Sequence, residues 1–445
     1  MLRSLLIAEL FGPHFACADA SMAATWRPFA ATKEMLPKWL RERRGEEEFS
    51  DLPIFEANMD LDETWAHQPF VLRGHGGLLE YQTAAEKFAL LQASASCDVR
   101  VGYSWSIAQN RGEGPQKMSL EEYLQSGMDQ GIYDNDIFLE PIYAFDMNLQ
   151  LPQLPGFDDL PEAISSWKTY GFSPERVVTV SMLGAPRSAV GWHSHGASMQ
   201  MTVHGRKRWF LYPPGQYPPG DGPGGGFSLS DWIQLVYPSL EDHQRPLECI
   251  VEAGDVVYVP DGWYHAVVNL ADTVGVSIQS RDMKPEAQEA FKGLSLQMVQ
   301  SMWEENPDTI EEIASAAREY LNQGLRNDLH ARRVLYYCLM QTNQTEAIDV
   351  ILEGVRKDPY HIPLQFELAS SLERQLKTES DQNISEVREV MRTLLEEWEP
   401  YLKANSRNQK AMWILNKFHR ALGHETVADS YFDRLVELNE KGIDR

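Results

Sequence analysis

Three histidines carry the clearest chemistry in this sequence. His193 and His195 stand two residues apart, and His265 lies within Gly254–Asn269, a segment with glycine and proline at its turns. Residues i and i+2 of a β-strand point to the same face, so both rings of the pair would project into a barrel. Imidazole suits iron, zinc, nickel or copper, and three protein ligands that leave open positions are typical of catalytic metal sites. The spacing therefore predicts a metal site, although a single histidine is more often a core or surface residue.

Short apolar segments around these histidines have the length and alternation of β-strands. The predicted strands are Val177–Gly184, Lys207–Tyr212, Leu247–Gly254, Asp255–Val259 and Val274–Gln279. Glycine and proline separate them, and a hairpin is expected about Gly205. Many short strands with such turns predict an all-β barrel or double-sheet roll.

Lys207 lies on one of these predicted strands. Strand alternation places it on the same face as Trp209 and Leu211, which have the character of core residues. A lysine that points inward needs an anionic partner, or its pKa falls. The pattern therefore favours a carboxylate ligand at Lys207. The alternative is a solvated lysine, because the residue also belongs to a basic cluster beside the hairpin turn.

The histidine segments resemble the two motifs of the cupins. Gly254-x5-Pro260-x-Gly262-x2-His265-x3-Asn269 fills every position of the second motif, and His193-x-His195 matches the centre of the first. Gly205–Pro214 and Asp261–His265 are similar to the Jumonji C branch of the cupins. Within that branch, Pro246–Cys249 and the His-x-His-Gly pattern look most like the subfamily of jumonji domain-containing protein eight.

This resemblance covers about residues 50–282 and implies a fold and a chemistry. The implied fold is a double-stranded β-helix, the cupin or Jumonji C jelly roll, with flanking helices. The implied cofactors are Fe(II) and 2-oxoglutarate, and the implied activity is hydroxylation of protein side chains or demethylation of lysine. A protein or peptide substrate is therefore expected.

The resemblance also assigns individual residues. His193 and His265 match two of the family's iron ligands. Lys207 matches the lysine that pairs with the far carboxylate of 2-oxoglutarate, and Asn269 matches a polar position near the cosubstrate. His195 stands where the family has its metal-binding carboxylate. A neutral imidazole there lowers the Coulomb attraction for Fe²⁺, which leaves three outcomes open: His195 coordinates the metal, it turns away, or the site is degenerate.

The composition changes after Arg281, where apolar residues take helical spacing and β-branched runs disappear. We expect a barrel domain at residues 23–285 and an all-α domain at residues 286–445. Helix breaks are expected after Asp358-Pro359, Asn405 and Asn439, and the last two are 34 residues apart, the period of tetratricopeptide helix pairs. A plain helical bundle that covers the barrel is the alternative.

The overall composition limits the partners. The chain has 445 residues and a net charge of −25, so a phosphate backbone would be repelled and no nucleic acid is expected. No later stretch approaches the ~20 apolar residues of a membrane span. Residues 1–22 have the outline of a secretory signal, with a disordered leader as the alternative. The expected location is accordingly the endoplasmic reticulum lumen or secretory pathway, or else the cytoplasm; the oligomeric state is not indicated.

Three functions remain open from the sequence. The first is an Fe(II)/2-oxoglutarate-dependent oxygenase of the protein hydroxylase kind with a variant His-x-His…His metal site. The second is a catalytically inactive Jumonji-like adaptor whose helical repeats bind protein partners. The third is a three-histidine cupin dioxygenase that needs no cosubstrate, in which Lys207 would have no clear role.

Overall fold

The computed structural model describes most of the barrel and of the helical region. The described residues are 50–56, 61, 63–73, 98–109, 114–127, 140–147, 170, 172, 176–214, 216, 218–220, 227–280, 296–322, 329–378, 384–404 and 409–440. The predicted leader at residues 1–22 lies outside these residues. It stays a prediction, as does the domain boundary at residue 285.

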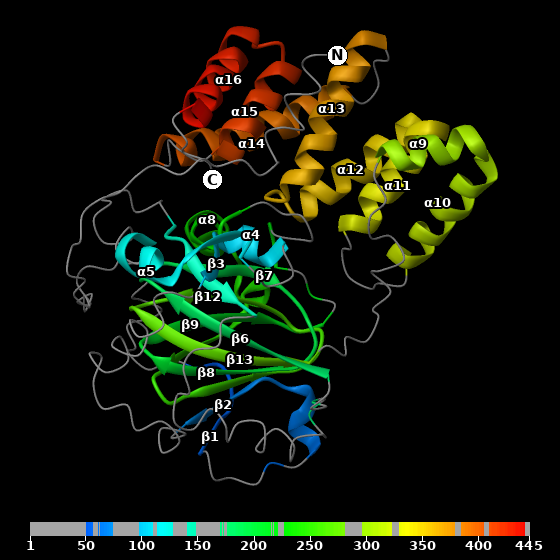
Figure 1. Ribbon diagram of the computed structural model, residues 1–445. Helices are drawn as coiled ribbons and strands as arrows, with labels where there is room; N and C mark the ends of the chain where they lie inside the picture. The colour runs from blue at the N-terminus through cyan, green and yellow to red at the C-terminus, as the bar shows by residue number, and fades with distance from the viewer. Residues whose placement is uncertain are drawn as a thin grey trace.

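Two β-sheets face each other and form the barrel (Figure 1). The larger sheet has the order β1-β2-β11-β8-β13-β6-β5-β3-β4, and its strands are β1 (Ile54–Glu56), β2 (Phe70–Arg73), β11 (Val256–Val259), β8 (Ser198–His204), β13 (Thr273–Ser280), β6 (Val177–Gly184), β5 (Tyr143–Asp146), β3 (Asp98–Gly102) and β4 (Gln116–Ser119). The smaller sheet has the order β10-β9-β12-β7, and its strands are β10 (Leu247–Glu252), β9 (Arg206–Tyr212), β12 (Tyr264–Asn269) and β7 (Ala189–His193). The predicted strands and the all-β double-sheet class are confirmed.

Strand alternation decides which side chains enter the space between the sheets. On β9, Trp209 and Leu211 pack in the cluster between the sheets, whereas Phe210 and Tyr212 belong to the cluster on the outer face. Gly205 has φ +83°, and a Cβ there would lie 2.1 Å from the Asp272 carbonyl oxygen, so the turn before β9 requires glycine. The predicted inward face of β9 is therefore present, and it includes Lys207, whose Nζ donates to the Tyr143 hydroxyl on the larger sheet.

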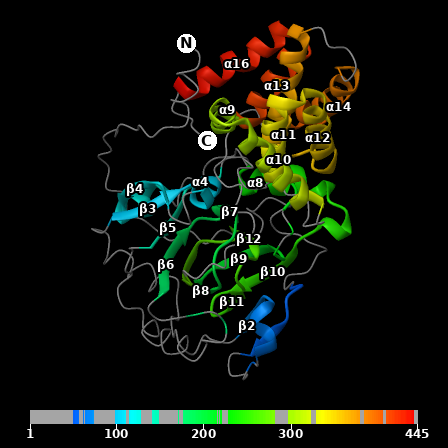
Figure 2. The ribbon, with the colours of Figure 1, turned by 90° about the vertical axis from the view of Figure 1, so that its right-hand side faces the viewer.

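Helices cover the barrel and continue beyond it. Near the barrel lie α4 (Ser104–Gln109), α5 (Leu120–Glu122) and α8 (Leu229–Asp231), and a π-helical stretch, Trp232–Val236, follows α8. The C-terminal region contains α9 (Leu296–Glu305), α10 (Pro307–Asn322), α11 (Leu329–Thr342), α12 (Gln344–Lys357), α13 (Ile362–Thr378), α14 (Ile384–Ala404), α15 (Gln409–Ala421) and α16 (Glu425–Glu440). Figures 1 and 2 both place this region over one end of the barrel, with α8 between the two.

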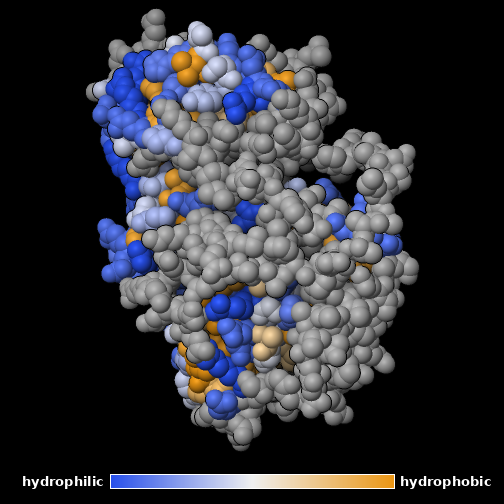
Figure 3. Space-filling view, turned by 90° about the vertical axis from the view of Figure 1, so that its left-hand side faces the viewer, coloured by the Kyte–Doolittle hydropathy of each residue, from blue (hydrophilic) through white to orange (hydrophobic). Residues whose placement is uncertain are grey.

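The C-terminal region is all-α in its described residues, as predicted. The expected break after Asp358-Pro359 separates α12 from α13. The expected break after Asn405 lies outside the described residues, between the end of α14 at Ala404 and the start of α15 at Gln409. Likeness to tetratricopeptide repeats is supported only by these consecutive helices and stays a prediction. The visible face of the helices is largely hydrophilic with a few scattered apolar residues (Figure 3), so most of their apolar side chains face inward. No helix among the described residues combines the length and apolarity that a membrane span requires.

A buried ion pair joins two strands of the smaller sheet. Arg208 donates from Nε and Nη2 to one oxygen of Glu248, at 2.9 and 2.7 Å, and Tyr237 donates to the other oxygen at 2.6 Å. Both charged side chains are buried. Removal of one partner leaves an uncompensated buried charge, which typically costs 3–5 kcal/mol.

We therefore expect Glu248→Ala to lower the free energy of unfolding by about 3 kcal/mol, measured by urea denaturation. The matched control is Glu252→Ala on the same strand, because Glu252 pairs with Arg206 at 2.9 Å in a half-exposed position. That change should cost less than about 1 kcal/mol. Equal losses in the two variants would contradict the prediction.

Candidate metal centre

The three predicted histidines converge at one position in the barrel. His193 is the last residue of β7 and pairs directly with His265 on β12, and His195 follows two residues later. Ring centroids are 4.2 Å apart for His193 and His265, 4.7 Å for His195 and His265, and 5.2 Å for His193 and His195. One nitrogen from each ring lies within 4.8 Å of the other two. His195 therefore faces the other two histidines.

Backbone carbonyls fix the tautomer of each ring. The Nδ1 atoms of His193, His195 and His265 lie 2.7, 2.7 and 3.0 Å from the carbonyl oxygens of Gly191, Gly196 and Trp263, respectively. A carbonyl only accepts hydrogen bonds, so each Nδ1 carries the proton and donates it. Each Nε2 then keeps a free lone pair. Metal-binding histidines are oriented in this way, with the second ring nitrogen donating to a carbonyl or carboxylate.

The environment also keeps the rings neutral. Burial and, to a lesser degree, the neighbouring His195 together lower the pKa of His193 to about 3. Burial likewise lowers the pKa of His195, and it holds the pKa of His265 well below its usual range. The rings therefore stay unprotonated at pH 7, the form in which imidazole binds a metal ion. His193 and His195 are only partly covered, so the cluster can be reached from solvent.

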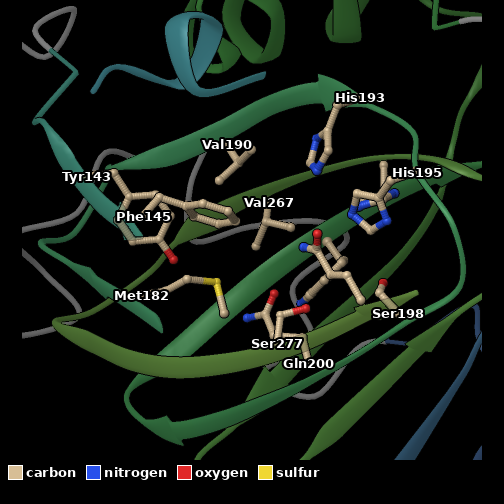
Figure 4. Close-up of a pocket in the computed structure, with 13 residues that line it drawn as sticks. Tyr143, Phe145, Met182, Val190, His193, His195, Ser198, Gln200, Val267 and Ser277 are labelled. Carbon is tan, nitrogen blue, oxygen red and sulfur yellow. The ribbon is translucent and has the colours of Figure 1, made fainter. Parts of the chain in front are cut away.

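A narrow pocket leads from the histidines into the barrel (Figure 4). Its walls are Tyr143, Phe145, Met182, Val190, His193, His195, Ser198, Gln200, Trp209, His265, Val267, Ser277 and Gln279. The free volume is about 10 Å³, which is room for about one water molecule. Phe145, Met182 and Val190 belong to one apolar cluster and exclude water from this side.

The opposite wall is polar. Ser198 and Gln200 on β8 pair with Gln279 and Ser277 on β13, and all four side chains are buried. The Gln200 Nε2 has no hydrogen-bond partner among the described residues, although the residue is buried and only 5% exposed. A buried amide without a partner is costly, so this donor is available to a ligand in the pocket.

Lys207 lies beyond the far end of the pocket. Its side chain is fully buried, and Nζ donates to the Tyr143 hydroxyl at 2.7 Å. No ion pair joins it to a carboxylate among the described residues, and burial lowers the pKa of Lys207 to about 7. Lys207 is not a wall of the pocket, but Tyr143 is. The hydrogen bond between these two side chains therefore connects the lysine to the pocket.

Asn269 is paired with Lys207 across β12 and β9. Its Nδ2 donates to the Ser188 hydroxyl at 2.8 Å. Burial raises the pKa of Tyr143, and a hydrogen bond with Asn269 offsets part of that rise. Like Lys207, Asn269 is not a wall of the pocket. The structure thus gathers the predicted metal residues at one end and the predicted cosubstrate residues behind the other.

Two site residues were not predicted from the sequence. Tyr143 falls in a proline-rich and acidic stretch, where the alternation of Tyr143 with Phe145 was the available sign of an inward strand face. Gln200 stands between Met199 and Met201, and alternation places it on the opposite face of the strand from the two methionines. Only the fold shows that this polar face lines the pocket.

Comparison with known proteins agrees with this architecture. Residues 113–280 match the family described as cupin-like domain. The mouse JmjC domain-containing protein 8 is 29% identical over 218 residues, which is 47% of this chain and 73% of the relative. The chain therefore carries a cupin-like domain. That domain is of the Jumonji C kind and has JmjC domain-containing protein 8 among its homologues, as the motifs predicted.

Two further relatives carry names that describe an activity. The Arabidopsis thaliana arginine-specific demethylase JMJ22 is 26% identical over 323 residues, 65% of this chain and 60% of the relative. The chicken 2-oxoglutarate and iron-dependent oxygenase JMJD4 is 39% identical over 89 residues, 18% of this chain and 20% of the relative. The matches thus cover less than two thirds of these two relatives.

Proposed function

We propose that this protein is a Jumonji C oxygenase that uses Fe(II) and 2-oxoglutarate to oxidise a protein side chain, as a hydroxylase. The observation that carries the proposal is one pocket with two complementary ends. Three imidazole lone pairs meet at the mouth, and a buried ammonium group with a phenol closes the far end. The relative JMJD4 is named for dependence on the same two cofactors.

The residues at the mouth fit a divalent iron ion. His193, His195 and His265 supply three neutral nitrogen donors whose tautomers are already set for binding. Nitrogen donors of this kind suit Fe(II), and three ligands leave positions for other molecules. Three neutral imidazoles attract Fe²⁺ less strongly than a ligand set that includes a carboxylate. The affinity of this site for Fe²⁺ should therefore be lower than that of a site with a carboxylate.

The residues at the far end complement the negative charge of one carboxylate of 2-oxoglutarate. Lys207 is a buried cation with a hydroxyl as its partner, and Tyr143 brings a second donor to the pocket wall. Gln200 adds a free amide donor between the two ends. The free volume of about 10 Å³ is too small for a five-carbon diacid, so side chains such as Met182 and Gln200 must rotate for it to enter.

Iron and 2-oxoglutarate, when bound, would activate O2, so that one oxygen atom enters a C–H bond of the substrate and the other leaves in succinate as CO2 is released. The side chains of this protein orient the diacid and shield the reacting groups from water. Lys207 and Tyr143 hold the diacid by its remote carboxylate, and Phe145 and Val190 keep water away from the reacting groups.

Turnover is the direct test. Purified protein with Fe(II), 2-oxoglutarate, ascorbate and protein extracts should release succinate in step with oxygen uptake, and Lys207→Met should not. Mass spectrometry of the substrate should show the gain of one oxygen atom; loss of a methyl group would instead indicate demethylation. Iron binding without succinate from any extract would contradict the proposal.

Binding of 2-oxoglutarate should also depend on pH through Lys207. Its pKa of about 7 means that the ammonium form disappears as the pH rises above 7. Because the diacid binds the cation, its affinity should fall by about tenfold per pH unit above 7 and level off below 6. Calorimetric titration of 2-oxoglutarate between pH 6 and pH 9 measures this, and a flat profile would contradict it.

An inactive adaptor is the second candidate, and His195 is the observation that favours it. The exchange of an anionic donor for imidazole and the small free volume would both follow if catalysis had been lost. The C-terminal helices would then bind partner peptides. Metal analysis separates the candidates: an adaptor holds no iron, and His195→Asp would create iron binding that the natural chain lacks.

A further inference from the structure

The helical region and the barrel share one continuous hydrophobic core. The outer face of the smaller sheet contributes Trp192 and Phe210 to this cluster, and the segment between β9 and β10 contributes Phe227 and Trp232. The same cluster continues through the helices to Trp398 and beyond. The described residues between β9 and β10 thus lie between the metal-bearing sheet and the C-terminal helices (Figures 1 and 2).

Two specific contacts connect that segment to the helices. The Gly220 N–H donates to the Asp358 carboxylate at 2.7 Å, and this carboxylate, at the turn between α12 and α13, is buried. Phe227 stacks on Trp398 of α14 with ring centroids 5.6 Å apart and planes inclined by 11°. Gly220 has φ +78°, and a Cβ there would lie 3.0 Å from the Cβ of Tyr360, so the contact is close.

Two further contacts lead from this segment to a histidine of the metal cluster. The Trp232 indole donates to the carbonyl oxygen of Pro219, the residue before Gly220, at 2.7 Å. The Trp232 ring meets the Trp192 ring edge-on, with centroids 4.9 Å apart. Trp192 immediately precedes His193 on β7, so its ring fixes the strand from the outer face while the histidine points inward.

The strand β7 depends on such packing more than its neighbours do. Among the described strands it lies at an edge and is hydrogen-bonded only to β12, and the register with β12 shifts between His265 and Val267. Its other side packs on α4, where the Ser104 hydroxyl accepts from the Leu229 N–H at 2.9 Å. The position of His193 is therefore set by one irregular ladder and by side chains tied to the C-terminal helices.

We propose that the C-terminal helices position His193 for metal binding, through Asp358 and Trp398, the segment between β9 and β10, and Trp192. The inference rests on the proposed metal site, and it makes Asp358 and Trp398 positioning residues that touch neither metal nor substrate. Groups that orient a metal ligand typically change affinity by 10- to 100-fold when they are lost.

The test uses the full-length chain with Asp358→Asn and Trp398→Leu, and Co²⁺ as the metal probe. Each variant should weaken Co²⁺ binding by about tenfold and shift its visible absorption bands. In the metal-free protein, amide hydrogen exchange of Ala189–His193 should rise by roughly tenfold, the effect of one lost hydrogen bond to a charged acceptor. Exchange in Thr273–Ser280, a central strand, should stay unchanged.

Two further variants separate positioning from general destabilisation. Trp398→Phe keeps an aromatic ring against Phe227 and should retain most of the affinity. Glu346→Gln removes an ion pair with Arg318 of α10, at the opposite end of α12 from Asp358, and should leave Co²⁺ binding and exchange in β7 unchanged. Unchanged β7 exchange and Co²⁺ spectra in Asp358→Asn and Trp398→Leu, or equal effects in Glu346→Gln, would overturn the inference. If the natural chain binds no Co²⁺, the proposed function fails while hydrogen exchange still decides the inference.

Discussion

Replacement of His265 by alanine is expected to abolish metal binding. His265 has the shortest ring separations from both other histidines, and its strand pairing with His193 places two ligands side by side. Because loss of an orienting partner alone costs up to about 100-fold in metal affinity, loss of a direct ligand should cost at least about 100-fold. Calorimetric or spectroscopic titration with Co²⁺ measures the change.

The same titration identifies the role of His195. His195→Ala should lose as much affinity as His265→Ala if all three rings coordinate, whereas a loss below about tenfold would leave a two-ligand site. His243→Ala is the control, because that side chain is 75% exposed and remote from the cluster. Co²⁺ binding by His265→Ala at the affinity of the natural chain would contradict the proposed metal centre.

Replacement of Lys207 by methionine should abolish 2-oxoglutarate binding and make the protein more stable. Lys207 is fully buried, and its pKa of about 7 lies far below the 10.5 of a free lysine. The unfolded chain therefore binds a proton more readily than the folded chain between these values. The folded state loses stability as the pH falls from 10.5 to 7, and methionine removes this cost. The gain at pH 7 should be roughly 4 kcal/mol.

Stability and binding should therefore move in opposite directions at this residue. The gain should shrink as the pH rises and vanish above about 10.5, which urea denaturation at several pH values can follow. Lys117→Met is the matched control, because Lys117 is 62% exposed and pairs with the exposed Asp98; it should change stability by less than about 0.5 kcal/mol. A loss of stability in Lys207→Met would show that the lysine holds the fold together rather than a ligand.

Local patterns predicted the strands well. The β6 strand has the predicted bounds Val177–Gly184, and β9 begins one residue before the predicted Lys207. Period-two alternation and the glycine turns are local properties, so they can be read without knowledge of the fold. The inward face of β9 followed from the same alternation and is confirmed by the hydrogen bond from Lys207 to Tyr143 on the larger sheet.

Contacts between distant segments could not be predicted in this way. Tyr143 meets Lys207 across 64 residues of sequence, and Gly220 meets Asp358 across 138. Alternation tells which face a residue occupies, but it does not tell which strands or helices lie opposite. The contact of Lys207 with Tyr143 and the contact of Gly220 with Asp358 could therefore be found only in the tertiary structure.

The sequence by itself determined the metal-binding residue types, the Jumonji C likeness and the presence of an imidazole at residue 195. Only the tertiary structure decided that His195 faces the other two rings and that backbone carbonyls leave all three Nε2 lone pairs free. The physical reason is that a side chain's identity limits what it can donate, whereas its tautomer, charge and direction depend on the groups that folding places around it.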